Sequence, residues 1–202
     1  MVVAVLQGSV RSERMGDRVA KWVISQLVAR GHEVVLVDAA ELDLPLLDKM
    51  WKELKGSSEG KYAILRDKLR PIAELYGRAD GFAIVSGEYN HSIPPALTNL
   101  LDYFLEEYLY RPSAIICYSA GQFGGVRAAM QLRALLPEVG MSSIPSLQAI
   151  PNVGSALSAN GIALTQALAE KSGSFFDEFE WYMTALQAGR ALSDPRKPQK
   201  QD

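Results

Sequence analysis

The sequence predicts an α/β domain in which a parallel β-sheet is covered by helices on both faces. Short apolar runs rich in β-branched residues alternate five times with longer segments whose apolar residues recur at helical spacing. This alternation is typical of parallel strands that are buried on both sides. A chain of 202 residues is long enough for one domain with a sizeable core and short for two.

Each regular element has its own signal. Five β-branched apolar runs predict the strands: 2–6, 34–37, 81–86, 113–118 and one within 142–150. Five segments with apolar residues at helical spacing predict the helices: 15–30, 62–77, 95–108, 126–136 and 165–188. Gly31 ends the first helix and Pro71 perturbs the second, whereas Pro145 blurs the limits of the fifth strand.

The remaining segments are predicted to be irregular. Pro45 keeps the loop 42–47 out of a central strand position. Residues 48–60 are polar and rich in glycine and serine, so we expect a lid or an excursion rather than core. Residues 151–163 are expected to form an irregular loop. The domain is predicted to span 1–190, and the polar tail 191–202, which contains two prolines, is expected to be disordered.

Composition narrows the classes of partner and compartment. A net charge of −2 gives no global basic field, which argues against nucleic acid as a partner. No apolar stretch approaches the roughly 18 residues that a transmembrane helix needs. The N-terminal run lacks a basic leader, so it is expected to be a strand rather than a signal peptide. The lone Cys117 suits a reducing compartment, and we expect a cytoplasmic protein without membrane association.

Three polar loops follow the first, third and fourth predicted strands: 7–14, 86–94 and 119–125. In a parallel sheet with helices on both faces, ligands bind beyond the carboxyl ends of the strands, where the winding direction reverses. We therefore expect these loops to converge on one edge of the sheet and to form the site.

The first loop is a phosphate-binding candidate, since it combines serine hydroxyls and arginines with a helix start. A solvated turn with exposed arginines explains the same residues. Glycines in the third loop permit a flat ligand to approach the backbone, although a tight strand-to-helix turn also accounts for them.

Several other sites are excluded by inspection. Val10 and Glu13 stand where a dinucleotide-binding fingerprint needs glycine, and no P-loop ending is present. A nucleophile elbow at Ser119 would need glycine at position 117, and both histidines precede that serine. Two histidines and one cysteine have no zinc-binding spacing, so no metal is expected.

Taken together, the three loops resemble those of the NADPH-dependent FMN reductases, which have the flavodoxin-like fold. The resemblance covers roughly residues 1–190 and rests on these residues: Gly8-Ser9-Val10-Arg11, Glu88-Tyr89-Asn90 with Ser92, Pro94 and Asn99, and the glycine-rich segment 118–127. The chain departs from the family pattern at three positions. Family members often have proline where Gly87 stands, lysine where Thr98 stands and serine where Arg14 stands.

The resemblance implies the strand order 2-1-3-4-5 and a non-covalently bound FMN. Its phosphate would lie on the first loop and its ring against the other two. The implied cofactor-binding residues are Ser9, Arg11, Arg14, Met15, Gly16, Glu88, Tyr89, Asn90, His91, Ser119, Ala120, Gly121 and Gly124. Backbone amides near Tyr89 to Ser92 and near Gly121 would hydrogen-bond the ring. No side chain is assigned a catalytic role, because the flavin carries the chemistry.

The resemblance further implies that NADPH supplies hydride, which passes to a quinone, a flavin, an azo compound or a metal oxyanion. An electron carrier or sensor without NADPH turnover is the alternative, although a charge of −2 is small for a flavodoxin-type carrier. A third, weaker alternative is an interaction domain that has lost its cofactor. A homodimer or homotetramer is expected, and the aromatic residues of the last predicted helix suit either an oligomer interface or plain core packing.

Overall fold

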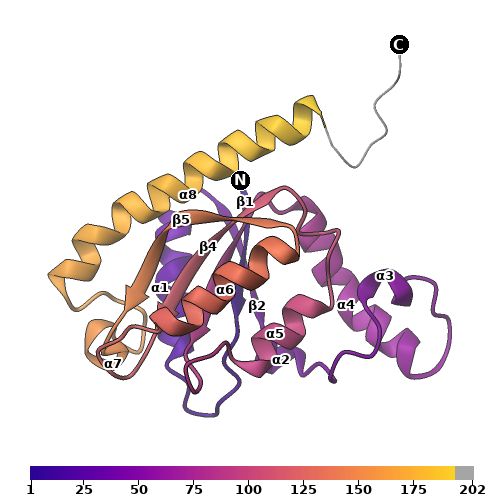
Figure 1. The fold of residues 1–202 in the computed structure, drawn as a ribbon, viewed down its shortest axis with the longest axis horizontal. Helices are drawn as coiled ribbons and strands as arrows, with labels where there is room; N and C mark the ends of the chain where they lie inside the picture. Colours follow the sequence, from indigo (N-terminus) through magenta and orange to yellow (C-terminus); the bar gives the residue numbers. More distant parts are fainter. Residues whose placement is uncertain (194–202) are drawn as a thin grey trace.

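The computed structural model describes residues 1–193 and contains a five-stranded, all-parallel sheet in the order β2-β1-β3-β4-β5 (Figure 1). The predicted fold class and strand order are therefore confirmed. The strands are β1 (Val2–Gln7), β2 (Glu33–Asp38), β3 (Gly81–Gly87), β4 (Arg111–Tyr118) and β5 (Met141–Ile150). Residues 194–202, which include most of the predicted tail, lie outside the described residues.

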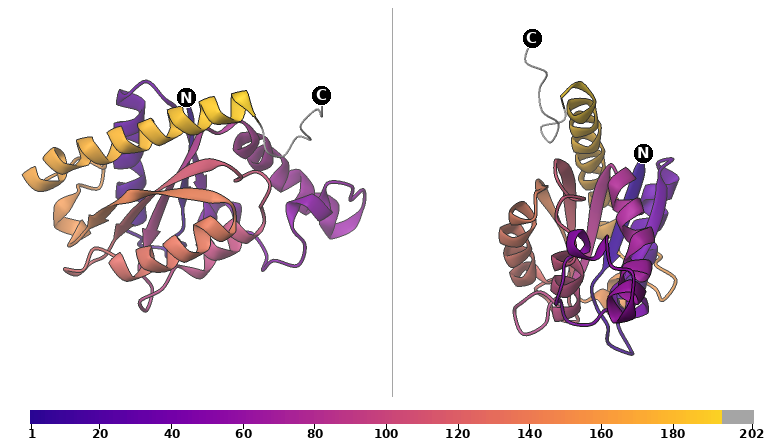
Figure 2. Two further views of the ribbon diagram at one scale, coloured as in Figure 1. Left: turned by 45° about the horizontal axis from the view of Figure 1, so that its top comes forward. Right: turned by 90° about the vertical axis from the view of Figure 1, so that its right-hand side faces the viewer.

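Helices cover both faces of this sheet, and Figure 2 shows α1 and α6 on opposite sides. The long helices are α1 (Gly16–Ala29), α4 (Gly60–Arg78), α5 (Pro95–Asp102), α6 (Val126–Glu138) and α8 (Gln166–Leu192). The short helices are α2 (Ala39–Leu42), α3 (Trp51–Leu54) and α7 (Val153–Ala156). Helix α4 continues through Pro71, and α7 lies within the predicted irregular loop 151–163. Within residues 1–193 no helix is long and apolar enough to cross a membrane.

The strands have two buried faces because successive side chains point to opposite sides. On β1, Val3 and Val5 pack with Trp22 of α1 in one apolar cluster. Ala4 and Leu6 belong to the second cluster, which lies under α4, α5 and α6. This double burial explains why the strands read as continuous apolar runs in the sequence.

The last helix contributes most of its aromatic residues to the core. Phe175, Phe176 and Phe179 of α8 are buried against the sheet, whereas Trp181 is 65% exposed. Core packing therefore accounts for these phenylalanines. Trp181 is left as an exposed indole on the outer side of α8.

The prediction that residues 48–60 form an excursion outside the core is wrong for α3. Trp51 and Leu54 are buried, and the amide N–H of Trp51 donates to the carbonyl oxygen of Tyr103 at 2.8 Å. The Trp51 ring also contacts Phe104, with 6.5 Å between the ring centroids. The segment is polar overall, but Trp51 and Leu54 are three residues apart and therefore lie on the same face of a helix.

The predicted helix 95–108 begins at Pro95 as expected but ends at Asp102. The chain then continues in turns, and the amide N–H of Tyr108 donates to the carbonyl oxygen of Leu105 at 3.1 Å. Phe104 and Tyr108 remain buried. The apolar spacing therefore predicted burial correctly but overextended the helix, because compact turns place these rings in the same core.

Candidate functional site at the carboxyl edge of the sheet

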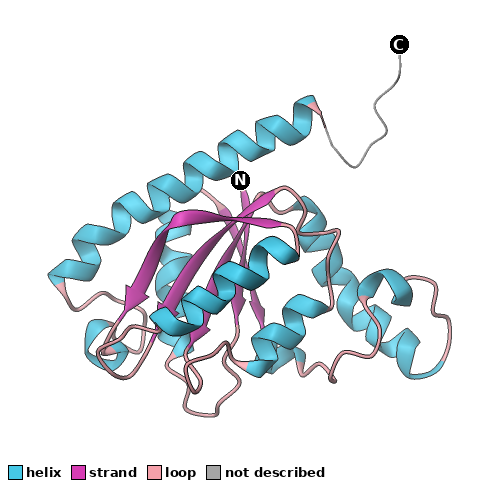
Figure 3. Ribbon diagram, in the orientation of Figure 1, coloured by secondary structure: helices cyan, strands magenta, loops and turns pink. Residues whose placement is uncertain are grey.

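Three loops lie at the carboxyl ends of the neighbouring strands β1, β3 and β4, toward which the strand arrows point in Figure 3. We call them loop 1 (residues 8–15), loop 2 (residues 88–94) and loop 3 (residues 119–125). The hydroxyl groups of Ser9 and Tyr89 are 2.7 Å apart and connect loop 1 to loop 2. Loops 1 and 2 are therefore in direct contact, and Glu88 of loop 2 contacts Arg127 at the start of α6, directly after loop 3. The three loops lie at one edge of the sheet, as the sequence predicted.

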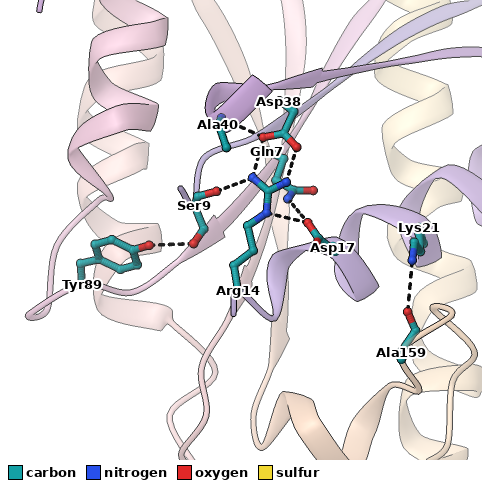
Figure 4. Close-up of polar contacts among 9 residues, drawn as sticks. All are labelled: Gln7, Ser9, Arg14, Asp17, Lys21, Asp38, Ala40, Tyr89 and Ala159. Carbon is teal, nitrogen blue, oxygen red and sulfur yellow. Dashed lines mark hydrogen bonds and ion pairs between the residues drawn. The ribbon is translucent and has the colours of Figure 1, made fainter. Parts of the chain in front are cut away.

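Arg14 is the centre of a partly buried polar network that joins loop 1 to β2 and α1 (Figure 4). Its Nη1 donates to the carbonyl oxygen of Ser9 at 2.7 Å and to Asp38 Oδ1 at 2.6 Å, and its Nη2 pairs with Asp38 Oδ2. Its Nε lies 2.7 Å from Asp17 Oδ1. The hydrogen bond to Asp38 is the main cause that raises the pKa of Arg14.

The carboxylates of this network come from two further elements. Asp38 ends β2, where its Oδ1 also accepts the amide N–H of Ala40 at 2.9 Å. Asp17, in the first turn of α1, accepts from Gln7 Nε2 at 2.6 Å. The guanidinium group of Arg14 thus braces loop 1 against β1, β2 and α1. Sequence reasoning missed both carboxylates, although Asp38 follows a predicted strand at the same edge of the sheet.

Arg11 differs from Arg14, because its exposed side chain makes no hydrogen bond or ion pair among residues 1–193. Met15 is 38% exposed, and Gly16 is buried at the start of α1. In loop 1 the guanidinium group of Arg11 is therefore free to bind a ligand, whereas that of Arg14 stabilises the loop.

Loop 2 is a tight hairpin. The amide N–H of Tyr89 donates to the carbonyl oxygen of Ser92 at 3.0 Å, and the reverse bond measures 2.9 Å. Asn90 and His91 form the exposed tip, with φ angles of 50° and 64°. Two successive positive φ angles are typical of two-residue hairpin turns, in which asparagine is well tolerated.

Helix α6 holds loop 2 through four polar contacts, two made by Glu88 and two by Gln131. Glu88 Oε2 accepts the amide N–H of Arg127 at 3.2 Å, and Glu88 Oε1 lies 2.8 Å from Arg127 Nε. One turn later, Gln131 Nε2 donates to the carbonyl oxygen of His91 at 2.9 Å, and Gln131 Oε1 accepts from Ser92 Oγ at 2.6 Å. Gln131 was not predicted as a site residue, because a glutamine within a helix gives no sequence signal.

Loop 3 is shaped by Ser119 and two glycines. Ser119 Oγ donates to the carbonyl oxygen of Gly121 and accepts the amide N–H of Gly124, both at 2.8 Å. Gly125 has a φ angle of 80°, and a Cβ there would lie 2.9 Å from the backbone nitrogen of Tyr118. Gly124 and Gly125 thus serve the tight turn. Gly121 is exposed, and a Cβ there would meet nothing within 4 Å.

Tyr118, at the end of β4, packs between the loops. Its hydroxyl oxygen would lie 2.7 Å from a Cβ at Gly16 and 3.1 Å from a Cβ at Gly87. A side chain at Gly16 or at Gly87 would therefore crowd the Tyr118 hydroxyl. Burial raises the pKa of Tyr118 to about 12, so its hydroxyl stays protonated at neutral pH.

In the described part of the chain, backbone amides of exposed loop residues are the main donors that remain without a partner at this edge. Among residues 1–193, the amide N–H groups of residues 10–12, 90–91 and 120–123 donate no hydrogen bond to protein, and these residues are exposed. The predicted donors Tyr89 and Ser92 are instead engaged in the hairpin. The edge therefore offers three sets of neutral donors and the Arg11 cation, which suit an anionic ligand rich in acceptors.

Neither thiol nor metal chemistry is favoured at this edge. Cys117 is buried in β4, and burial followed by the charge of Glu88 raises the pKa of its thiol to about 12. A reactive cysteine needs the opposite shift. The described residues contain no group of three or more histidine, cysteine, aspartate or glutamate side chains that could hold a metal ion.

Comparison with known families gives a match over most of the chain. Residues 1–154 match the family model described as NADPH-dependent FMN reductase. A Schizosaccharomyces pombe protein named NAD(P)H-dependent FMN reductase is 27% identical over 150 residues, which are 73% of this chain and 72% of that protein. An Escherichia coli quinone reductase is 28% identical over 138 residues, covering 66% of this chain and 68% of the relative.

Solved structures share the fold. The flavoenzyme NAD(P)H:(acceptor) oxidoreductase FerB of Paracoccus denitrificans superposes with a TM-score of 0.69 at 20% identity, covering 93% of this chain and 97% of that one. A variant of flavodoxin from Pseudomonas aeruginosa gives a TM-score of 0.50 at 18% identity, covering 93% and 98%. At these identities the two likenesses show that the fold is flavodoxin-like.

Proposed function

This chain belongs to the NADPH-dependent FMN reductase family, and from that premise we propose that it binds FMN at loops 1–3 and reduces quinones or flavins with NAD(P)H. The observation that carries the proposal is the convergence of three sets of unused amide donors on the edge that bears the family's motifs. Residues 1–190 act as the single FMN-binding domain in this proposal.

The donor set at the edge fits FMN. The phosphate suits loop 1, where the amides of residues 10–12 and the exposed Arg11 lie next to the start of α1. Ser9, which is 2% exposed, supports this loop through its contact with the Tyr89 hydroxyl. Arg14, with Met15 and Gly16 beside it, keeps this loop in shape through Asp38 and Asp17.

We propose that the isoalloxazine ring lies against loops 2 and 3. The amides of Asn90 and His91 and those of residues 120–123 would serve the ring's carbonyl and nitrogen acceptors. Ala120 and Gly121 are exposed, and the open space at Gly121 lets a flat ring approach the backbone. Glu88, Tyr89, Ser119 and Gly124 hold the two loops in place.

When bound, FMN supplies the redox chemistry by accepting hydride from NAD(P)H and passing electrons to the acceptor. The contribution of the protein is positional. Neutral amide donors fixed at one edge stabilise negative charge without having to reorganise. No acid, base or nucleophilic side chain is assigned to the reaction.

Quinones and free flavin are the acceptors we favour, and the names of the two relatives support them. Azo compounds and metal oxyanions make similar demands on an exposed ring, so they belong to the same proposal. Both relatives are named as reductases, which gives no support to the alternative of an electron carrier or sensor. We further propose that the enzyme works in the cytoplasm as a homodimer or homotetramer, and the lone buried thiol is consistent with a reducing compartment.

Steady-state oxidation of NADPH with a simple benzoquinone tests the proposed reaction. The FMN-loaded protein should oxidise NADPH over many turnovers per flavin, and protein stripped of FMN should regain activity only when FMN is added back. FMN binding with negligible turnover for quinone, free flavin and azo acceptors alike would favour the electron carrier and overturn the reductase.

A further inference from the structure

The arginines at the carboxyl edge differ in whether their guanidinium N–H donors are already bonded to protein. Arg14 is committed to Asp38 and Asp17, and Arg18 donates to the carbonyl oxygen of Leu157 at 2.9 Å. Arg11 is uncommitted but belongs to loop 1. Between loops 2 and 3, the arginine that remains is Arg127, in the first turn of α6.

The guanidinium group of Arg127 is fixed from two sides. Its Nε lies 2.8 Å from Glu88 Oε1, a contact that is an ion pair rather than a well-aligned hydrogen bond. Its central carbon lies 4.5 Å from the centroid of the Phe123 ring, so the planar group is held over an aromatic face. Glu88 is 7% exposed, and it therefore forms a firm anchor.

The outer edge of this guanidinium group is available. The Arg127 side chain is 38% exposed, and among residues 1–193 its two Nη atoms make no hydrogen bond to protein. Two parallel N–H donors on a fixed plane match the oxygens of a phosphate group. The Glu88 carboxylate and the Phe123 ring restrict this fork, so it loses less conformational entropy on binding than an uncontacted arginine side chain would.

We infer that Arg127 binds a phosphate group of the pyridine nucleotide and thereby sets the affinity for the electron donor. The inference rests on the proposed function, because that function brings the nicotinamide to the ring between loops 2 and 3. A pyridine nucleotide carries negative charge only on its pyrophosphate and, in NADPH, on the 2′-phosphate. Both have the chemistry that the Arg127 fork recognises.

Initial rates with saturating FMN and quinone test this role in wild type, Arg127→Ala and Arg127→Lys. Alanine should raise the KM for NADPH roughly ten- to hundredfold, since hydrogen bonds to a charged partner are lost, while kcat changes little. Lysine should restore part of the affinity, because it keeps the charge without the fork. A rise for NADPH alone identifies the 2′-phosphate, whereas equal rises for NADPH and NADH identify the pyrophosphate.

Two controls separate this role from a structural one. The double variant Glu88→Gln/Arg127→Ala removes the buried carboxylate that Arg127→Ala leaves unpaired, and it should keep the same rise in KM. Arg70→Ala, which removes an exposed arginine of α4 outside loops 1–3, should leave FMN binding and both KM values unchanged. Inhibition by 2′,5′-ADP and by ADP, each competing with NADPH, reports nucleotide affinity without turnover.

An Arg127→Ala enzyme that matches wild type in KM and in inhibition by both nucleotides would overturn the inference. So would a variant that loses FMN affinity in step with nucleotide affinity, because Arg127 would then act only by shaping the flavin site. A wild-type protein that takes up FMN but oxidises neither nucleotide would instead refute the proposed function.

Discussion

At the scale of single residues, the charged side chains of the edge mainly hold loops in place. Glu88 caps the start of α6, and Arg14 joins loop 1 to β2. Within the residues that the structure describes, the donors at this edge without a hydrogen bond to protein are mainly backbone amides of exposed loop residues, together with Arg11 and Arg127. Motif residues at this edge therefore act largely through the backbone geometry that they stabilise.

Two glycines of loop 3 test the distinction between residues that hold a loop in place and residues that face the proposed ligand. Gly125→Ala should lower the free energy of unfolding by more than about 1 kcal/mol, because the residue has a φ angle of 80° and its Cβ would crowd the backbone of Tyr118. Gly121→Ala should leave stability nearly unchanged but weaken FMN binding, since its Cβ enters the space proposed for the ring. Urea unfolding and FMN titration measure the two effects. Equal stability of both variants would contradict the assignment.

The buried thiol gives a second prediction at this scale. The pKa of Cys117 is raised to about 12, mainly by burial. At pH 8 only about one thiol in 10⁴ is then ionised, compared with roughly a quarter for a free thiol. We expect native protein to resist iodoacetamide at pH 8 and unfolded protein to react, as followed by mass spectrometry. Rapid labelling of the native protein would show that the thiol is accessible.

At the scale of elements, loop 1 depends on the ion pair between its own Arg14 and Asp38 of β2. Both side chains are largely buried, with exposed fractions of 13% and 3%. Without Arg14 the buried Asp38 carboxylate loses its counter-charge, and without Asp38 the Arg14 guanidinium keeps only the more exposed Asp17. Removing one partner of a buried pair usually destabilises more than removing both.

A double-mutant cycle with Arg14→Ala and Asp38→Ala tests this dependence. Each single variant should lose about 2–4 kcal/mol of stability, and the double variant should lose less than the sum of the two. Binding of FMN relative to riboflavin, which lacks the phosphate, reports on loop 1 itself. Additive losses in stability, together with an unchanged ratio of FMN to riboflavin affinity, would contradict the claim that the Arg14–Asp38 ion pair maintains the conformation of loop 1.

The same elements show what a sequence can specify. The five strands were predictable because double burial produces continuous β-branched runs, and Pro95 marked the start of α5. The end of α5 at Asp102 was not predictable, since Phe104 and Tyr108 keep a helical spacing while they pack from turns. Glu88, Tyr89 and Ser119 were expected at the edge from their motifs. Asp38 and Gln131 act through long-range contacts that no local pattern records.

At the scale of the whole molecule, the sheet buries both faces and leaves the carboxyl edge to the loops, while a few large apolar side chains remain outside. Trp181 of α8 is 65% exposed and Ile64 of α4 is 73% exposed. An oligomer would cover some of this surface. Assembly is therefore expected to involve residues that the core does not use.

Sedimentation equilibrium tests the proposed assembly. We expect a mass of about two or four times the 22.1 kDa of one chain. If the outer side of α8 forms the contact, Trp181→Ser should shift the protein toward monomer, whereas Ile64→Ser should not. A wild-type mass near 22.1 kDa at micromolar concentration would contradict the homo-oligomer.

Flavin binding by the purified protein tests the central claim most directly. Protein freed of flavin should quench FMN fluorescence with one equivalent of FMN per chain, and it should bind riboflavin at least tenfold more weakly, because only FMN carries the phosphate that loop 1 is proposed to hold. Failure to take up FMN, or equal affinity for FMN and riboflavin, would contradict the account.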